Sequence, residues 1–467
     1  MKKRFVVGSI GALLLLAVGA AAALYFGNRR DVTTSSEAAF RAYREALENE
    51  RHFYFKEARD GFARALELDP EFAEAMLGLA RRSNPEQART LVRRAAKLRD
   101  RLTDRERLHV DLQLAGVEGK MDDVYRICRT IHEKYPEDIR AAMILAAHEI
   151  EAGNSEKALQ IFSELLAVEP NNAEAYNQIG YFYAYRGEYD KAIENIKKYQ
   201  FMAPDQANPY DSLGEIQAYS GHYDEAIANL NHALKLKPDF FAAYLHMGIA
   251  YEGKGDYARA IESFRKGAHE ATEEGMQREH LRQALRAAYA ADDVVAARQV
   301  TAELEAIPGD EHPELTRLVF DAVVDMMEGR PAKAEPEIRK AQSMLAALYS
   351  SSKETSESGK AVVEFLDPGL AFLLAQSYER QGKDDEAIAL LEKLAGSPKT
   401  YAGFESRRWV LASRAVLAEI VARRGDLDRA EKLLAENHKW NPSWAPVRSA
   451  EQVVAQLRRE KVLAASK

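Results

Sequence analysis

The chain has 467 residues, and its 65 basic and 73 acidic side chains give a formal net charge of −8 and a sequence pI near 5.9. This balance argues against nucleic acid as the main partner, because nucleic acid requires a basic surface. Cys128 is the only cysteine, which excludes an intramolecular disulfide. We interpret it as a small buried residue at a helix contact.

An apolar run near the start of the chain extends from Phe5 to Phe26. As a helix it is long enough to cross a hydrocarbon core of roughly 30 Å. Three basic residues precede it and two follow, which favours the N-terminus inside and the remainder outside. Residues 1–30 are therefore predicted to anchor the chain in the cytoplasmic membrane, with the rest extracytoplasmic (periplasmic). The alternative is a signal peptide cleaved near 20–23, which would give a secreted protein.

Helical pairs are predicted to begin directly after this run, over 31–104. A first pair, near 39–72, has apolar and small residues at helical spacing followed by a proline. In the second pair, over 73–104, Asn84-Pro85 interrupts the pattern about four residues early, because proline cannot continue a helix. We interpret this second pair as a shortened unit.

In residues 105–274, glycine, alanine and proline recur at a spacing of 34 residues. Small residues and prolines keep this step: Gly119, Gly153, Gly187, Gly221 and Gly255; Ala158, Ala192, Ala226 and Ala260; Pro136, Pro170, Pro204 and Pro238. Glycine ends a helix in the left-handed conformation at little cost, and small residues let two helices approach closely. The period predicts five regular helical pairs, which must stack because one pair cannot bury both its faces.

Beyond residue 274 the period loosens. Residues 275–349 are predicted to form divergent helical pairs. Residues 350–367 begin with a polar run that has no apolar period, and they are predicted to be a flexible insertion and connector. The pattern returns over 368–467, where a last helix near 445–461 would cap the array with a polar outer face.

The regular units resemble the tetratricopeptide repeat (TPR) family. In the unit that starts at Ala173, Tyr176, Ile179, Gly180 and Tyr183 match the spacing of the family's W-x2-L-G-x2-Y pattern, with Tyr in place of Trp. The resemblance implies an all-α fold, a TPR solenoid with a right-handed superhelix. The repeats counted along the sequence give about eleven hairpins, after the N-terminal transmembrane helix predicted from the apolar run. Such an array presents a long surface for holding another protein.

Two stretches of the sequence indicate similarity to a more specific group of TPR proteins. They are Leu-Thr-Asp-Arg-Glu-Arg at 102–107 and Asp-Gln-Ala-Asn-Pro-Tyr-Asp-Ser-Leu-Gly-Glu at 205–215. They are similar to the TPR regions that bacterial membrane-bound serine/threonine kinases and adenylate cyclases carry outside their catalytic domain. We find no kinase or cyclase domain in the sequence, so the similarity covers the appended part alone. In such kinases a membrane span separates the catalytic part from TPRs outside, which agrees with the orientation inferred above.

Motifs for catalysis, metals or cofactors are missing from the sequence. It has no HExxH, paired-cysteine, GxSxG or Walker pattern, and its eleven histidines are scattered. Gly253-Lys254-Gly255 lies in a repeat turn with no strand before it, so it does not predict a phosphate loop. We therefore expect no catalytic, cofactor-binding or metal-binding residues and no enzymatic activity. A site within 276–367 is the remaining enzymatic alternative.

The resemblance also implies where a partner protein or extended peptide would bind, because first helices line the concave groove in this family. It assigns eleven groove residues: Asn177, Gln178, Tyr181, Tyr185, Asn208, Asp211, Ser212, Glu215, Tyr219, His246 and Glu252. The basic residues of the family's carboxylate clamp are missing here, and the acidic ones favour a neutral or basic segment. The predicted function is a non-enzymatic, membrane-tethered scaffold. The alternative is a sensory or regulatory subunit of a separately encoded kinase or cell-envelope complex.

Overall fold

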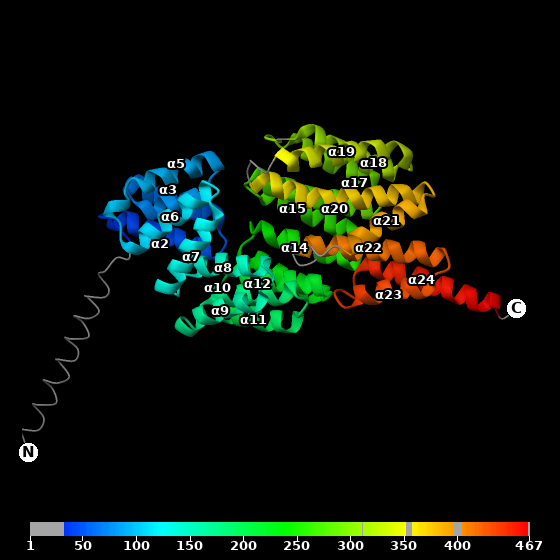
Figure 1. The fold of residues 1–467 in the computed structure, drawn as a ribbon, viewed down its shortest axis with the longest axis horizontal. Helices are drawn as coiled ribbons and strands as arrows, with labels where there is room; N and C mark the ends of the chain where they lie inside the picture. The colour runs from blue at the N-terminus through cyan, green and yellow to red at the C-terminus, as the bar shows by residue number, and fades with distance from the viewer. Residues whose placement is uncertain (1–31, 311, 352–356, 397–403, 466–467) are drawn as a thin grey trace, which may run out of the picture. The chain divides into compact units, whose positions relative to one another are not determined.

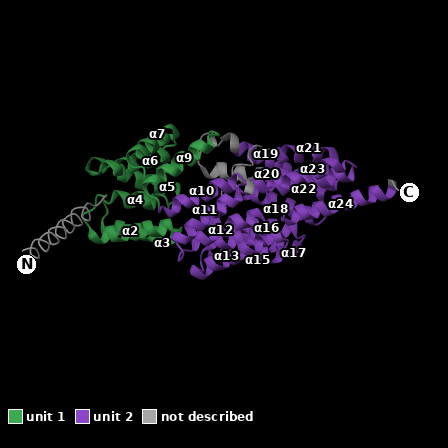
Figure 2. Cartoon of the chain, turned by 90° about the horizontal axis from the view of Figure 1, so that it is seen from below, with its two compact units in different colours: residues 1–170 green, residues 171–467 purple. Residues whose placement is uncertain are grey.

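The computed structural model describes residues 32–310, 312–351, 357–396 and 404–465. Within these ranges the regular structure is entirely helical, with 23 α-helices and no strand. The chain divides into two compact units between Pro170 and Asn171 (Figures 1 and 2). This division falls inside the segment 105–274 that the sequence predicts as one regular run.

Unit 1 consists of consecutive helical hairpins, and its second hairpin is short. Its helices are α2 (Glu37–Arg51), α3 (Phe55–Leu68), α4 (Ala73–Ala80), α5 (Pro85–Ala96), α6 (Asp104–Val117), α7 (Met121–Lys134), α8 (Ile139–Glu151) and α9 (Ser155–Val168), with a short 3₁₀ helix at Arg99–Arg101. Helix α4 has only 8 residues. The next helix starts early because Asn84 accepts a hydrogen bond from the Gln87 N–H at 2.9 Å and Pro85 occupies the first turn.

Unit 2 contains seven hairpins in its described part, followed by a last helix. Its helices are α10 (Ala173–Tyr185), α11 (Tyr189–Met202), α12 (Ala207–Ser220), α13 (Tyr223–Leu236), α14 (Phe241–Lys254), α15 (Tyr257–Glu270), α16 (Glu274–Ala290), α17 (Val294–Ala306), α18 (Pro313–Met327), α19 (Pro331–Ser351), α20 (Glu357–Arg380), α21 (Asp384–Ala395), α22 (Phe404–Arg423), α23 (Leu427–His438) and α24 (Ala445–Ala465). The last three, orange to red in Figure 1, return to the green helices at the start of the unit.

The five glycines at the 34-residue step end the first helix of each regular pair. Their φ angles lie between +71° and +90°. At Gly221 and Gly255 this left-handed residue is the C-cap itself. A side chain with a Cβ would be strained in this conformation. The turn after each first helix therefore requires glycine, which explains why glycine recurs every 34 residues.

A second kind of glycine lies inside the first helices, where the partner helix packs against it. A Cβ on Gly180 would lie 2.5 Å from Ile196 Cδ1, and one on Gly248 would lie 2.5 Å from the Phe264 ring. Both distances are far below van der Waals contact. In these two hairpins the helices therefore approach as closely as they do only because these positions have no side chain.

We expect Gly180→Ala to destabilise unit 2 by about 1–3 kcal/mol, because the added methyl must displace Ile196. Gly275→Ala is the matched control, since nothing lies within 4 Å of a Cβ there. We expect the control to be neutral or stabilising by about 0.5–1 kcal/mol. Urea denaturation measures both changes. Equal midpoints for the two variants would contradict the close packing.

The N-terminal segment of the described chain is fixed to unit 1 by Glu106. The Thr33 N–H and hydroxyl each donate to the Glu106 carboxylate at 2.6 Å. The same carboxylate accepts from the Thr103 N–H at 2.8 Å, and the Thr103 hydroxyl accepts from the Glu106 N–H, which forms a capping box at the start of α6. The stretch 102–107 thus begins a helix and holds the segment that precedes the repeats.

The prediction of a flexible connector over 350–367 is wrong for most of its length. Helix α19 continues to Ser351 and helix α20 begins at Glu357, while 352–356 lie outside the described residues. Residues 357–367 include Glu, Lys, Ala and Leu, which are strong helix formers. Polarity without an apolar period was therefore a poor indicator of a loop.

The predicted membrane span, Phe5 to Phe26, lies outside the described residues. Among the helices that the structure does describe, none has both the length and the apolar content to cross a bilayer. Cys128 is buried in α7 without a disulfide partner.

Candidate functional site

The predicted groove residues gather on neighbouring helices of unit 2, but they are not open to solvent. All eleven come from the successive first helices α10, α12 and α14. Six are buried, namely Asn177, Asn208, Asp211, Ser212, Tyr219 and Glu252, and the other five are half-buried. In this structure the predicted groove is therefore covered, and its role in partner binding stays a prediction. The cover is the C-terminal part of the same unit.

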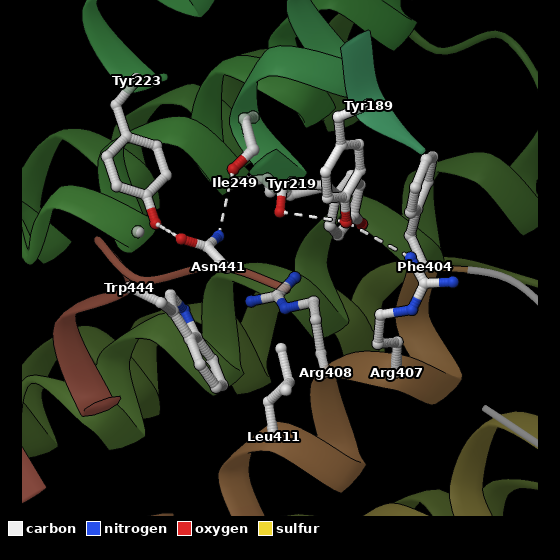
Figure 3. A pocket seen from close by; sticks show the side chains of 12 residues that line it. Tyr189, Tyr219, Tyr223, Ile249, Phe404, Arg407, Arg408, Leu411, Asn441 and Trp444 are labelled. Atoms are coloured by element: carbon white, nitrogen blue, oxygen red, sulfur yellow. Dashed lines mark hydrogen bonds between the residues drawn. The ribbon is translucent and has the colours of Figure 1, made fainter. Parts of the chain in front are cut away.

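The first turn of α22 places Phe404 beside the groove residue Tyr219 (Figure 3). Phe404 is 5% exposed and stacks on Tyr219, with 4.1 Å between ring centroids and 12° between the planes. The Tyr185 and Tyr181 rings lie beside it, at centroid distances of 5.0 and 6.5 Å. Stacked and tilted aromatic pairs add to the stabilisation from burial, so this ring is a principal contact between the two ends of unit 2.

Arg407, one turn further along α22, binds the C-terminal end of α10. Its guanidinium donates to the carbonyl oxygens of Ala184, at 3.2 Å, and Tyr185. The last carbonyls of a helix have no partner within the helix and carry partial negative charge, so a cation is favoured here. The opposite side of the guanidinium lies 3.9 Å from the centre of the Trp440 ring.

Arg408 completes a buried ion pair with Glu252 of α14. Its Nη2 lies 2.5 Å from Glu252 Oε1, and Arg286 of α16 donates to the same oxygen. Glu252 is only 3% exposed. Burial opposes the ionised carboxylate, but the charges and hydrogen bonds of Arg286 and Arg408 outweigh it, so the pKa of Glu252 is lowered. This carboxylate holds α14, α16 and α22 together.

The loop between α23 and α24 closes the other side of the contact. Asn441 accepts a hydrogen bond from the Tyr223 hydroxyl at 3.0 Å and donates to the Ala218 carbonyl at 3.4 Å. It approaches so closely that a Cβ on Gly221 would lie 2.8 Å from its Oδ1. The cavity that remains among these side chains is about 20 Å³. It has room for about one water molecule and excludes a peptide.

Two acidic groove residues beside this contact, Asp211 and Glu215, pair with His246. Its Nδ1 lies 2.8 Å from Asp211 Oδ1 and its Nε2 lies 3.5 Å from Glu215 Oε1. The Tyr181 hydroxyl donates to the other oxygen of Glu215 at 2.5 Å. Burial alone would lower the pKa of His246, but the charges of Asp211 and Glu215 raise it to about 9.

This pKa predicts a pH dependence of stability. Folded His246 keeps its proton up to about pH 9, whereas the unfolded side chain loses it near 6.5. Its contribution, roughly 3 kcal/mol, is therefore complete below pH 6.5 and lost as the pH rises through about 9. The difference in unfolding free energy between the wild type and His246→Gln should shrink over this range. A constant difference would contradict it, and His269→Gln, at an exposed histidine, is the control.

Sequence reasoning missed Phe404, Arg407 and Arg408, although it did favour a basic segment for this groove. The basic segment found there belongs to the chain itself. One feature of the sequence did indicate a contact surface in this segment, because all three tryptophans of the chain lie between 409 and 444. Among the described residues, no group of three or more His, Cys, Asp or Glu side chains is arranged to hold a metal ion.

Family models match three segments of the chain. A model described as TPR repeat matches residues 214–255, and two described as tetratricopeptide repeat match 161–194 and 370–399. The chain therefore contains tetratricopeptide repeats, and the described part is an all-helical TPR solenoid. No curated protein matches the sequence. The narrower similarity to kinase and cyclase TPR regions stays a prediction.

Three of the solved structures with a similar fold are the following. The Cut9-Hcn1 hetero-tetramer of the APC/C is 14% identical with a TM-score of 0.46, over 89% of this chain and 76% of that one. Yeast Tom70 is 16% identical with a TM-score of 0.39, over 91% and 96%. PilW, a type IV pilus biogenesis factor, is 22% identical with a TM-score of 0.35, over 44% and 95%.

Proposed function

We propose that this protein is a non-enzymatic scaffold that holds partner proteins on its repeat array, tethered to the cytoplasmic membrane by residues 1–30. The observation that carries the proposal is the succession of TPR hairpins through both units. Each hairpin adds surface without enclosing a cavity, which suits the binding of another protein. The orientation rests on the charges around the apolar run, which favour the repeats outside the membrane.

The Thr33–Glu106 contact supports a short tether. Thr33 is only three residues beyond Arg30, the end of the predicted anchor. Three residues span at most about 10 Å. If residues 1–30 cross the bilayer, unit 1 begins within that distance of the membrane surface. A reporter fused to the C-terminus should be active only on the extracytoplasmic side, and activity inside would contradict this orientation.

Site-specific photo-crosslinking in cells tests the scaffold itself. A photo-reactive residue is placed on the first helices, at Gln178 and at Gln113, and on second helices as controls, at Gln160 and Glu194. We expect the same partner protein to be captured from the first-helix positions and not from the controls. Capture from none of the positions, or equally from all four, would contradict binding along the first helices.

The alternative, a regulatory subunit of a separately encoded kinase or envelope complex, is favoured by the contact of α22 with the predicted groove. A partner that uses Tyr181, Tyr219 and Glu252 must compete with Phe404 and Arg408, so its binding would be controlled by this contact. The variant with both Phe404→Ala and Arg408→Ala should then retain more of a membrane-spanning partner on purification from membranes. Equal retention by the variant and the wild type would count against regulation.

A further inference from the structure

Three arginines converge on one carboxylate on the inner side of unit 1. Arg81 donates from Nε and Nη2 to the two oxygens of Glu50, at 3.1 and 2.7 Å. Arg82 donates to the same carboxylate at 3.0 Å. Arg140, from the first turn of α8, lies 3.9 Å from it, beyond hydrogen-bond distance. One negative charge thus faces three positive charges.

The arginines keep unused hydrogen-bond donors. Within the described part of the chain Arg140 makes no hydrogen bond, and its side chain is 33% exposed. Arg81 Nη1 is buried without a partner. The charge of Arg81, together with burial, lowers the pKa of Arg140, which means that the two guanidinium groups repel each other. Folding places them side by side at a cost that an anion would offset.

The other acidic groups near Arg140 are already engaged. Glu74 and Asp138 accept from the two ring nitrogens of His109, at 2.8 and 3.0 Å. Burial opposes the charged imidazole, but these two carboxylates raise the pKa of His109 to about 9, so it is a cation at neutral pH. Arg105 also donates to Asp138 at 3.0 Å. Over the whole cluster five positive groups face four carboxylates, which leaves an excess of one positive charge; the groups are Arg81, Arg82, Arg105, Arg140 and His109, against Glu50, Glu74, Glu137 and Asp138.

The unpartnered groups on this side of unit 1 are hydrogen-bond donors. Gln113 Nε2 is buried without a partner, one helical turn along α6 from His109. Arg81 Nη1 is the second such donor. In unit 2, by comparison, Glu252 pairs with two arginines, and His246 lies between Asp211 and Glu215. A ligand for unit 1 must supply acceptors and negative charge.

We propose that Arg140, with Arg81 and Arg82, binds side-chain carboxylates of an acidic segment in a partner protein. This inference rests on the proposed scaffold function and assigns the chemistry of one binding surface. Planar guanidinium groups bind carboxylates through paired hydrogen bonds, and two adjacent groups favour neighbouring acidic side chains. The first helices of consecutive hairpins provide a surface along which such a segment can extend.

The test measures peptide binding to the full-length protein in detergent by fluorescence anisotropy. The probe is a labelled ten-residue peptide with four glutamates and an amidated C-terminus. We expect binding that weakens by about tenfold or more in Arg140→Gln, because charge-assisted hydrogen bonds are lost. Arg126→Gln, on α7 with an exposed Asp123 partner, should bind like the wild type. A peptide with glutamine in place of glutamate should not bind.

Thermal unfolding separates a binding role from a structural one. Arg140→Gln removes a repulsion, so its unfolding temperature should equal or exceed that of the wild type. A lower temperature together with weaker binding would overturn the proposal, because Arg140 would then support the fold. Equal binding of the glutamate and glutamine peptides, or of the wild type and Arg140→Gln, would overturn it as well.

Two further binding measurements distinguish other sources of the negative charge. Binding only by a neutral peptide with a free C-terminal carboxylate would assign a chain terminus, and binding only by vesicles with anionic lipid would assign a membrane surface; either result overturns the proposal. Failure of the scaffold function is distinguishable. If no crosslinked partner is found in cells while the acidic peptide binds through Arg140, the inference stands and the proposed function fails.

Discussion

Glu252→Ala should lower the free energy of unfolding of unit 2 by about 3–5 kcal/mol. The substitution leaves Arg286 and Arg408 buried against each other with no carboxylate between them. Removing one member of a buried ion pair costs more than the pair contributes, because the remaining charge stays desolvated. Native-state hydrogen exchange of the α14 and α22 amides gives the opening free energy that checks this value.

A matched control is available one helix away. Glu262 of α15 pairs with Lys266 at 2.8 Å, four residues along the same exposed helix face. Glu262→Ala should change the stability by less than about 0.5 kcal/mol, because exposed pairs at this spacing contribute little. If Glu252→Ala behaves like this control, the buried ion pair does not hold unit 2 closed.

Phe404→Ala should destabilise the contact between the two ends of unit 2 by about 3–5 kcal/mol. The ring is almost fully buried against Tyr219 and Tyr185, so its removal leaves a cavity that rigid helices on both sides cannot fill. We expect faster hydrogen exchange in the last turn of α12 and the first turn of α22, with little change in α17. The near-ultraviolet circular dichroism of the tyrosines should weaken in parallel.

Phe201→Ala provides the comparison for this variant. Phe201 lies in the same unit, near the end of α11, and is 85% exposed. Its removal should alter stability by no more than about 0.5 kcal/mol, as for most surface substitutions. A loss of stability in Phe404→Ala no larger than in Phe201→Ala would show that the first turn of α22 is not held in the groove.

The repeat fold was predictable because its determinants are local. Gly187 ends a helix through its own backbone, and Gly180 matters because of Ile196, which is only 16 residues away in the same hairpin. The positions of the groove residues followed from the same register, and the structure does bring Tyr181, Glu215 and His246 into one network. Each of these contacts joins residues within a hairpin or in adjacent hairpins.

The cover over the groove was not predictable in this way. Arg408 contacts Glu252 across 156 residues, and Arg407 contacts Ala184 across 223. Such a contact depends on the total rotation between distant hairpins, which is the sum of small rotations from one hairpin to the next. No local sequence pattern predicts that total rotation. The arginines around Glu50 were missed for a different reason. The family pattern that marks groove positions is clear only in the most regular units, whereas Arg81 follows the shortened α4.

The last helices of unit 2 pack against its first helices. In an open array each repeat touches only its neighbours, so the ends fray independently and folding proceeds from local contacts. In unit 2 these contacts join residues more than 150 positions apart, as in the 156-residue separation of Glu252 and Arg408, and distant contacts slow folding. We therefore expect unit 2 to unfold as one cooperative block, with its closing contacts the last to form.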